Sequence, residues 1–353
     1  MAGRAKRKAS PAPRAATARS KKRPPTRAPR MTVVPTTMKA AAIDRFGPPD
    51  VLTSRTVPTP RVGPGEVLIA LHAAGVGFWD AKIRDGTWAE GDERFPLILG
   101  SDGAGTIAAL GSRVRGFDLD QPVWAYAYEN EKGGFYAEYV AVATENAAPC
   151  PARLDLLHAG AAAVTAMTAQ QGIDDHLGVR RGETVLVFGG TGAVGTLAIQ
   201  FARRKQARVV ATASGRAAAE LVRQLGSHGS FDARNPKELM QLPALAPNGI
   251  DAVLALAGGD ALERCLDLMN PGGRVAYPNG VEPAPRARRG LKVRAYDATP
   301  GRRQWQRLDR AVSEARLTVP IAATYPLARA AQAHARVEKG HVVGRVALQI
   351  RRG

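Results

Sequence analysis

The apolar positions of the chain change their pattern once, near residue 165. Between residues 38 and 164 they form short runs separated by glycine and proline, of which 67–71, 103–107 and 122–126 are the clearest. Short strands at this spacing are typical of a barrel or sandwich. From 165 to 301 apolar runs alternate with helix-like stretches, as in a sheet of buried parallel strands. The pattern predicts a β-rich domain followed by an α/β domain with a doubly wound parallel sheet.

The α/β segment is expected to contain four strands, after which the chain returns to the first domain. These strands are predicted at 184–188, 208–213, 252–256 and 274–277. A helix at 327–338 and a closing strand at 344–350 follow. We therefore assign 38–164 together with 302–353 to the β-rich domain, and 165–301 to the α/β domain.

A glycine-rich turn joins the first of these strands to a helix predicted at 196–205. The turn reads Gly190-Thr191-Gly192-Ala193-Val194-Gly195, which is G-x-G-x-x-G in the strand–turn–helix context that this motif requires. Gly190 permits the tight turn, Gly192 lets backbone N–H groups approach a pyrophosphate, and Gly195 lets helix and strand pack closely. The helix N-terminus also favours phosphate groups. These six residues are therefore predicted to bind a dinucleotide.

The end of the second strand favours NADPH over NADH. An NAD site usually places Asp or Glu there to bind the ribose 2′-hydroxyl, whereas this chain has Ser214-Gly215-Arg216. A hydroxyl and a guanidinium suit a 2′-phosphate, because the guanidinium can form two charge-assisted hydrogen bonds to it. We predict that Ser214 and Arg216 bind this phosphate. The alternative is that Arg216 only begins a solvated helix and that both cofactors bind.

The loops after the third and fourth strands supply further candidates. Ligands of open α/β sheets lie outside the carboxyl ends of the strands. The two loops contain Ala257-Gly258-Gly259 and Asn279-Gly280. We expect Ala257, Gly258, Asn279 and Gly280 to face the cofactor.

Length and composition fit a two-domain protein of a reducing compartment. A chain of 353 residues exceeds one typical hydrophobic core. It has no apolar stretch of 18 residues, so no membrane contact is predicted. Its two cysteines, Cys150 and Cys265, provide no disulfide framework. We therefore expect a cytoplasmic location.

The net charge of +19 is concentrated at the N-terminus. Residues 1–30 contain 11 Lys or Arg and no acid, so the remaining residues carry +8. The segment 1–37 is poor in large apolar residues and is predicted to be a disordered basic tail. Its basic clusters 6–8 and 21–23 could contact nucleic acid. Two alternatives stay open: a transit peptide, which the many prolines disfavour, and a dispensable extension ahead of an internal start.

Several segments, in order along residues 38–353, resemble the medium-chain dehydrogenase/reductase superfamily. Residues 75–86 resemble G-V-N-x-x-D-x-K-x-R-x-G, residues 97–105 resemble the P-G-x-D-x-x-G turn, and residues 340–346 resemble G-H-x-x-G-K-x-V. The quinone oxidoreductase (zeta-crystallin-like) branch is the most similar. The resemblance implies a Rossmann domain joined to a chaperonin-10-like (GroES-like) barrel, and a homodimer.

The resemblance also implies that no metal is bound. Zinc relatives place Cys at the position of Gly77 and a His–Glu pair at Ser101-Asp102. Catalytic zinc needs three protein ligands of the Cys, His or carboxylate type, and two cysteines cannot form a four-cysteine structural site. Without a Lewis acid, the expected reaction is hydride transfer from NADPH to a quinone or an α,β-unsaturated carbonyl, with a proton from solvent.

By resemblance, Lys82 approaches the cofactor or the substrate carbonyl, and Thr168 the nicotinamide. The ammonium of Lys82 could polarise a carbonyl oxygen, and the alternative is an exposed lysine on a helix. Asp80 is expected to stabilise its helix or loop. An aromatic wall for a flat substrate is proposed, although each member could instead belong to the core. Its members are Phe78, Trp79, Trp124, Tyr126 and Tyr128.

Two departures from the family pattern bear on specificity. Gly77 replaces an asparagine near the pocket, which leaves the substrate class open, and Ala233 replaces a tyrosine common in NADPH-specific relatives. Two other functions also stay open. One is an enoyl or polyketide-type reductase, and the other is a non-enzymatic NADPH-binding protein that contacts nucleic acid through residues 1–30.

Overall fold

The computed structural model describes residues 1, 3, 34–89, 91, 94–128 and 130–351. Apart from residues 1, 3 and 34–37, the predicted tail therefore lies outside the described residues. Within 34–37, the carbonyl of Thr36 accepts the N–H of Thr59 at 2.9 Å, and Thr37 begins a strand. Val34 packs against a small apolar cluster. Residues 34–37 are thus ordered, contrary to the prediction, because backbone pairing ties them to the domain.

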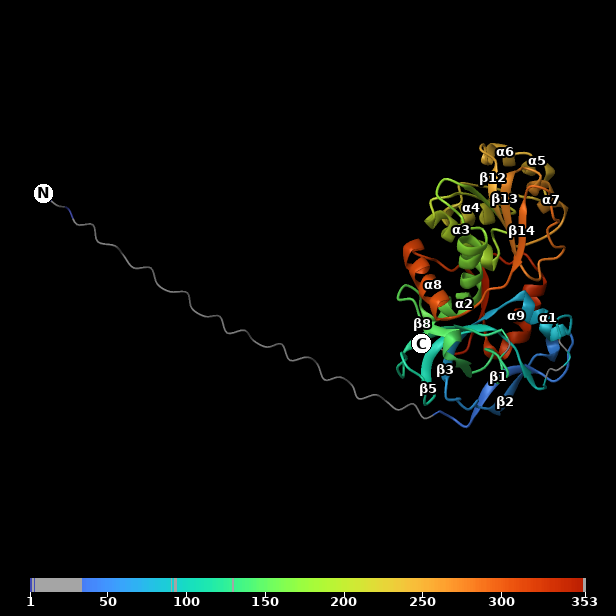
Figure 1. Cartoon of the computed structure of the whole chain (residues 1–353). Coiled ribbons are helices and arrows are strands. Elements are labelled where there is room, and N and C mark those ends of the chain that lie inside the picture. Colours follow the sequence, from blue (N-terminus) through green and yellow to red (C-terminus); the bar gives the residue numbers. More distant parts are fainter. Residues whose placement is uncertain (2, 4–33, 90, 92–93, 129, 352–353) are drawn as a thin grey trace. The chain divides into compact units, whose positions relative to one another are not determined.

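Six parallel strands form the sheet of the α/β domain, in the order β11-β10-β9-β12-β13-β14. Figure 1 labels β12, β13 and β14 of this sheet. The order runs outward from β9 in one direction and from β12 in the other, which defines a doubly wound sheet with its switch point between these two strands. The bounds are β9 Thr184–Phe188, β10 Arg208–Thr212, β11 Gly229–Phe231, β12 Ile250–Ala255, β13 Met269–Pro278 and β14 Lys292–Tyr296. The four predicted strands are confirmed, and the two edge strands β11 and β14 were missed.

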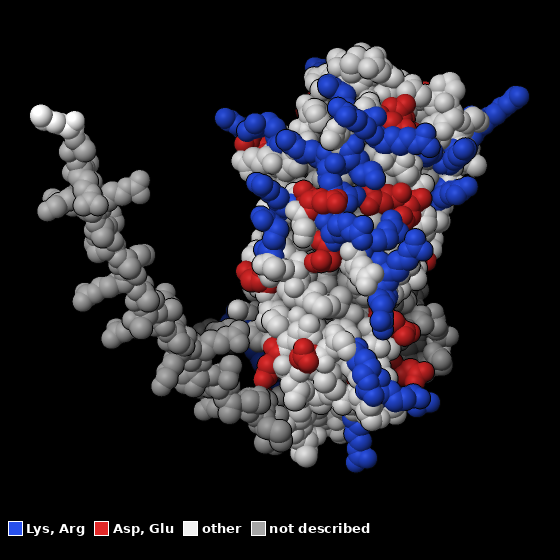
Figure 2. Space-filling view, turned by 60° about the vertical axis from the view of Figure 1, so that its left-hand side comes forward, with Lys and Arg blue, Asp and Glu red and all other residues white. Residues whose placement is uncertain are grey.

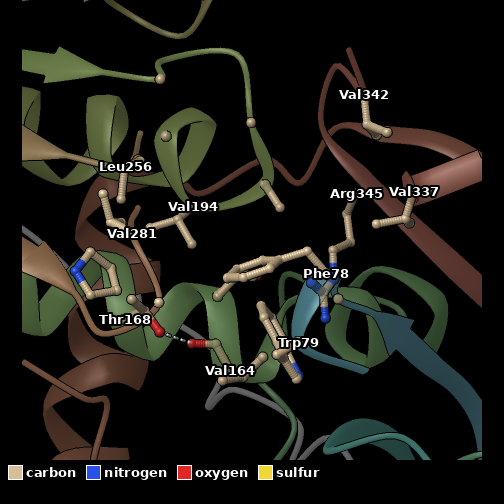
Figure 3. A pocket seen from close by; sticks show the side chains of 18 of the residues that line it. Phe78, Trp79, Val164, Thr168, Val194, Leu256, Val281, Val337, Val342 and Arg345 are labelled. Atoms are coloured by element: carbon tan, nitrogen blue, oxygen red, sulfur yellow. Dashed lines mark hydrogen bonds between the residues drawn. The ribbon is translucent and has the colours of Figure 1, made fainter. Parts of the chain in front are cut away.

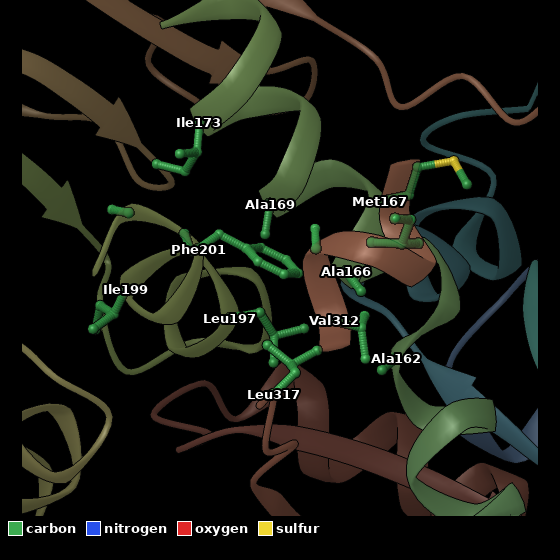
Figure 4. Close-up of a cluster of buried hydrophobic side chains, with 14 of the residues drawn as sticks. Ala162, Ala166, Met167, Ala169, Ile173, Leu197, Ile199, Phe201, Val312 and Leu317 are labelled. Atoms are coloured by element: carbon green, nitrogen blue, oxygen red, sulfur yellow. The ribbon is translucent and has the colours of Figure 1, made fainter. Parts of the chain in front are cut away.

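Helices cover both faces of this sheet. Successive residues of β9 alternate between two cores, with Val185 and Val187 in one and Leu186 and Phe188 in the other. The helices that contribute to the first core are α2 Leu156–Gln171, α3 Ala193–Arg204, α4 Arg216–Gln224 and α8 Arg302–Ala315, and those of the second are α5 Pro236–Leu239, α6 Leu242–Leu245 and α7 Asp260–Leu266. Figure 4 shows Phe201 of α3 within the first core.

The β-rich domain contains a seven-stranded and a three-stranded sheet. In the larger one the order is β15-β16-β3-β5-β6-β8, with β7 also paired to β3; in the smaller one it is β2-β1-β4. The bounds are β1 Thr37–Ile43, β2 Thr53–Pro58, β3 Glu66–Val76, β4 Leu97–Ile98, β5 Asp102–Leu110, β6 Pro122–Tyr126, β7 Tyr139–Ala143, β8 Ala147–Pro149, β15 Ile321–Pro326 and β16 Arg345–Gln349. Because β16 pairs antiparallel with β3, the predicted return of the closing strand is confirmed.

The helices of the β-rich domain were only partly predicted. The segment predicted at 327–338 forms a short turn and then α9 Ala330–Glu338. α1 Phe78–Asp85 and α2 were missed. α2 spans the assigned domain boundary, and α8 packs mainly on α2 and α3, although its Trp305 also contacts Trp124 and the carbonyl of Glu145 in the β-rich domain. Within the described residues, no helix combines the length and the apolar character that crossing a membrane requires.

Candidate functional site

A cavity of about 1320 Å³ lies between the two domains. One side is formed by the glycine-rich turn and the strand ends of the α/β domain, and the other by α1 and neighbouring segments of the β-rich domain (Figure 3). Its position at the carboxyl ends of β9 and β12 coincides with the switch point of the sheet, where α/β folds bind ligands.

The glycine-rich turn is shaped by three glycines with different surroundings. A Cβ on Gly195 would lie 2.2 Å from the carbonyl oxygen of Gly189, and one on Gly190 would lie 2.8 Å from the Cβ of Ala211. Gly192 instead has open space, since the nearest atom to its Cβ would be 3.5 Å away. Gly190 and Gly195 therefore serve the packing of the turn, and Gly192 leaves room at the start of α3 for a bound group.

Most of the turn lines the cavity. The lining includes Gly189, Thr191, Gly192, Ala193, Val194 and Gly195, whereas Gly190 packs against β10. The C-terminal segment meets this turn directly, because the N–H of Gly344 donates to the carbonyl of Thr191 at 2.8 Å. The open Gly192 and the unobstructed N-terminus of α3 form a cradle that fits a dinucleotide pyrophosphate.

The predicted 2′-phosphate residues lie at the end of β10, outside the cavity lining. Ser214 is exposed, and Arg216 is the exposed first residue of α4. Asp232, which follows β11, lies nearby. Burial raises the pKa of this carboxyl, but hydrogen bonds from Arg234 and Ser214 outweigh that effect and leave the pKa below its usual value. Arg234 Nε also lies 3.5 Å from Asp232. This group of two arginines, a hydroxyl and one ionised acid was only partly anticipated.

The other predicted cofactor residues are distributed as follows. Ala257, Asn279, Gly280 and Thr168 line the cavity. Gly258 packs instead on the neighbouring loop, where a Cβ would lie 1.9 Å from the carbonyl oxygen of Pro283. Thr168 points toward the cavity, and its hydroxyl donates to the carbonyl of Val164 at 2.8 Å (Figure 3).

Aromatic side chains line the side of the cavity formed by the β-rich domain. Of the predicted wall, Phe78, Trp79, Tyr126 and Tyr128 line the cavity. Trp124 does not: it is fully buried and packs with Trp305 at a ring distance of 5.3 Å. It lies on the face of β6 that packs against α2 and α8, so for this residue the core alternative holds.

Trp88 also lines the cavity and was not predicted. Its ring lies edge-on to Phe78 at 5.6 Å, and it reaches across to Gly280 of the α/β domain. A Cβ on Gly280 would lie 2.4 Å from this indole. The signal for Trp88 was its place in the segment that follows α1, three residues after Asp85.

The departure at Gly77 has a packing explanation. The indole of Trp79 covers Gly77, and a Cβ there would lie 2.3 Å from the ring. The same indole donates from Nε1 to the hydroxyl of Ser101 at 2.7 Å. An aromatic ring thus occupies the space that a polar side chain at residue 77 would need.

Lys82 is exposed on α1 and is not among the described residues that line the cavity. Its backbone carbonyl accepts the N–H of Trp88 at 3.1 Å. The geometry gives its ammonium no contact with the glycine-rich turn, so its role in catalysis stays a prediction.

A buried ion pair beside the cavity was missed by sequence reasoning. Arg345 lines the cavity, donates from Nη2 to Asp102 Oδ1 at 2.8 Å, and stacks on the Trp79 ring at 5.0 Å. Asp102 also accepts the N–H of Val164 at 3.1 Å. Both side chains are almost fully buried. Arg345 and Asp102 lie 243 residues apart in the sequence. The only sequence feature that pointed to this pair was the basic residue in the motif at 340–346.

The positions that hold zinc in relatives have other partners here. The hydroxyl of Ser101 accepts a hydrogen bond from the indole N–H of Trp79, and the carboxylate of Asp102 accepts one from Arg345. Burial raises the pKa of Cys150 and of Cys265 to about 12, so both thiols are protonated. In the part of the chain that the structure describes, no group of three or more His, Cys, Asp or Glu is placed to hold a metal ion.

Comparison with known proteins identifies the family. The description "Alcohol dehydrogenase GroES-like domain" matches residues 63–152, and "Zinc-binding dehydrogenase" matches residues 225–348. Quinone oxidoreductase of Rattus norvegicus is 30% identical over 313 residues, covering 84% of this chain and 93% of that protein.

Two solved structures have the same architecture. An NAD-dependent alcohol dehydrogenase has a TM-score of 0.82 and 30% identity, covering 89% of this chain and 100% of that chain. The mycobacterial protein Rv1454c, solved in complex with NADPH, has a TM-score of 0.77 and 27% identity, with the same coverage. The fold, the cradle at the glycine-rich turn and these relatives together establish an NAD(P)H oxidoreductase. The chain belongs to the quinone oxidoreductase (zeta-crystallin-like) branch of the medium-chain dehydrogenase/reductase family.

Proposed function

We propose that this protein reduces a quinone or an α,β-unsaturated carbonyl with NADPH and without a catalytic metal. The observation that carries the proposal is the composition of the cavity, which has a dinucleotide cradle on one side and five aromatic side chains on the other: Phe78, Trp79, Trp88, Tyr126 and Tyr128. A planar acceptor between these two sides would lie against the reactive end of the cofactor. The relatedness to quinone oxidoreductases supports this acceptor class.

The residues of the chain contribute binding and orientation. The N-terminus of α3 would hold the pyrophosphate, and Thr168 and Val194 line the cavity where the reactive ring would enter. The bound cofactor supplies a hydride. Quinones and enones stabilise the incoming charge within their own π-system, so solvent can supply the proton. Arg345, buried against Trp79 and paired with Asp102, presents its guanidinium beside the acceptor side.

Turnover with a panel of acceptors tests this function. The full-length chain should oxidise NADPH with quinones or simple enones, before and after exhaustive chelation. Oxidation with enoyl thioesters only would instead support the enoyl reductase alternative. Binding of NADPH without oxidation by any acceptor would support the non-enzymatic alternative, and activity lost on chelation and restored by zinc would contradict the metal-free proposal.

Cofactor choice is tested at Arg216. If its guanidinium binds the 2′-phosphate, Arg216→Ala should weaken NADPH binding about ten- to a hundredfold, because a charge-assisted hydrogen bond contributes about 1.5–3 kcal/mol. NADH binding should change little. Titration of both cofactors measures this, with Arg223→Ala, an exposed arginine on the same helix, as the matched control. Equal weakening of both cofactors would remove the assignment.

The role of Lys82 is tested by Lys82→Met. If its ammonium reaches the substrate oxygen during the reaction, kcat should fall by about a hundredfold or more, as when one preorganised donor is lost. If it grips only the cofactor, the loss should disappear at saturating NADPH. Lys237→Met, at another exposed lysine, is the control. Unchanged steady-state kinetics would identify Lys82 as a solvated surface residue.

The homodimer, the cytoplasmic location and the nucleic-acid contact of residues 1–30 also stay predictions. On the face that Figure 2 displays, Lys and Arg side chains are interspersed with Asp and Glu. Such mixed charge is typical of a solvated surface, so this face gives the nucleic-acid alternative no support.

A further inference from the structure

A row of buried polar side chains connects α1 to α9. Arg84 Nη1 lies 3.3 Å from His334 Nδ1, and His334 Nε2 lies 3.3 Å from the hydroxyl of Tyr136. This hydroxyl donates to Asp80 Oδ2 at 2.9 Å. None of these four residues is more than 1% exposed. Buried polar groups are costly unless every donor and acceptor is satisfied, and the proposed reaction uses none of these groups directly.

One arrangement of protons satisfies the whole row. Arginine can only donate, so His334 Nδ1 accepts. Burial, reinforced by the charge of Arg84, lowers the pKa of His334 to about 3, so its ring is neutral and carries its proton on Nε2. Nε2 then donates to Tyr136, and Tyr136 donates to Asp80. Every hydrogen bond points from Arg84 toward Asp80, which fixes the orientation of each side chain.

The row ends at the first turn of α1. Asp80 Oδ2 also accepts the N–H of Gly77 at 2.7 Å, and Gly77 directly precedes the helix. The next two residues, Phe78 and Trp79, line the cavity. The carboxylate of Asp80 therefore determines where the backbone that carries these two rings begins.

The other end of the row is attached to two further segments. Arg84 Nη2 donates to Glu338 of α9 at 2.6 Å, and Arg84 Nε donates to the carbonyl of Gly47 at 2.9 Å. α1 is thus held at its first turn and at its last turn by residues distant in sequence. Neither attachment involves the glycine-rich turn.

We propose that Tyr136 and His334 are positioning residues for acceptor binding: through Asp80 they hold the first turn of α1, so that the rings of Phe78 and Trp79 keep the orientation in which they line the cavity. This inference rests on the proposed reductase function. Because α1 belongs to the acceptor side, loss of the row should disturb acceptor binding and leave cofactor binding intact.

Tyr136→Phe removes only the hydroxyl at the centre of the row. The KM for the acceptor should rise about three- to tenfold, the effect of losing one to two hydrogen bonds, while the dissociation constant of NADPH stays within about twofold. Tyr139→Phe is the matched control, since this buried tyrosine packs on Arg351 and takes no part in the row. A fall in kcat with an unchanged acceptor KM would mean that the row serves stability alone, and would overturn the proposal.

Asp80 provides a rescue experiment, because both of its hydrogen bonds end on the same oxygen. Asp80→Asn can place its amide oxygen there and accept from Gly77 and Tyr136, whereas Asp80→Ala cannot. Burial raises the pKa of Asp80 to about 7, so the uncharged amide resembles a form that the native site already tolerates. The acceptor KM should stay near the native value in Asp80→Asn and rise in Asp80→Ala. Equal effects of both variants would contradict the positioning role.

Amide hydrogen exchange tests the same proposal without any turnover. In Tyr136→Phe and in Asp80→Ala, exchange across residues 77–85 should accelerate about tenfold or more, with residues 189–204 unchanged. If the wild-type chain oxidises no NADPH but the variants show this exchange pattern, the proposed reductase function is wrong, while the proposal that these residues hold α1 in place is supported. Unchanged exchange in both variants would overturn the hold itself.

Discussion

Gly192→Ala and Gly195→Ala are expected to fail in different ways, although both change the same motif. A Cβ on Gly195 would lie 2.2 Å from the carbonyl oxygen of Gly189 and 2.8 Å from the Cα of Gly190, and both are backbone atoms that cannot move aside alone. Overpacking of this kind costs about 3 kcal/mol or more. Gly195→Ala should therefore lower the free energy of unfolding substantially, as measured by denaturant titration.

Gly192→Ala should leave the fold nearly intact and weaken the binding of the cofactor. Gly192 has a φ of −72°, which alanine adopts freely, and its Cβ would meet only one atom, at 3.5 Å. The cost in stability should stay within about 1 kcal/mol, mostly from the poorer N-cap. The new methyl group projects into the cradle, so NADPH binding should weaken at least about tenfold, or 1.4 kcal/mol. Similar losses of stability in both variants would contradict the different roles assigned to these glycines.

The elements that could be predicted from sequence are those that local residue patterns encode. The strand at 184–188, the glycine-rich turn and the start of α3 depend on residues within a span of about 20 positions, and the structure has them in place. α2 was missed because it is apolar on all sides. Of its residues, 159–171 are all buried, so no periodic pattern separates a polar face from an apolar one.

The site could be predicted only on its α/β side. The cavity there is built by loops at the ends of predicted strands, whereas the opposite wall depends on contacts between distant segments. Trp88 reaches Gly280 across the cavity, Arg345 reaches Asp102, and His334 reaches Tyr136. Nothing in the local pattern distinguishes Trp88 from a core tryptophan such as Trp124. Which aromatic residues face the cavity is decided by packing, and therefore appears only in the structure.

Asp102→Ala should be among the most destabilising single changes near the cavity. Asp102 is fully buried and binds both Arg345 and the N–H of Val164. Its removal leaves the guanidinium of Arg345, which is 3% exposed, without its carboxylate. Breaking a buried pair by removing one partner costs about 3–5 kcal/mol. Glu220→Ala, which breaks an exposed pair on α4, should change the unfolding midpoint little and is the control.

A double variant separates the cost of an unpaired charge from the loss of packing. In Asp102→Ala/Arg345→Met neither member of the pair is left without the other, and the methionine can still cover Trp79, so the double variant should be more stable than Asp102→Ala. Denaturant titration of the single and double variants gives the coupling free energy. If the stability losses of the two single variants add up to that of the double variant, the ion pair contributes little to stability. The guanidinium must then be held by its stacking on Trp79 instead. If the double variant recovers stability but raises the acceptor KM, Arg345 is kept for the charge that it presents to the acceptor side of the cavity rather than for the fold.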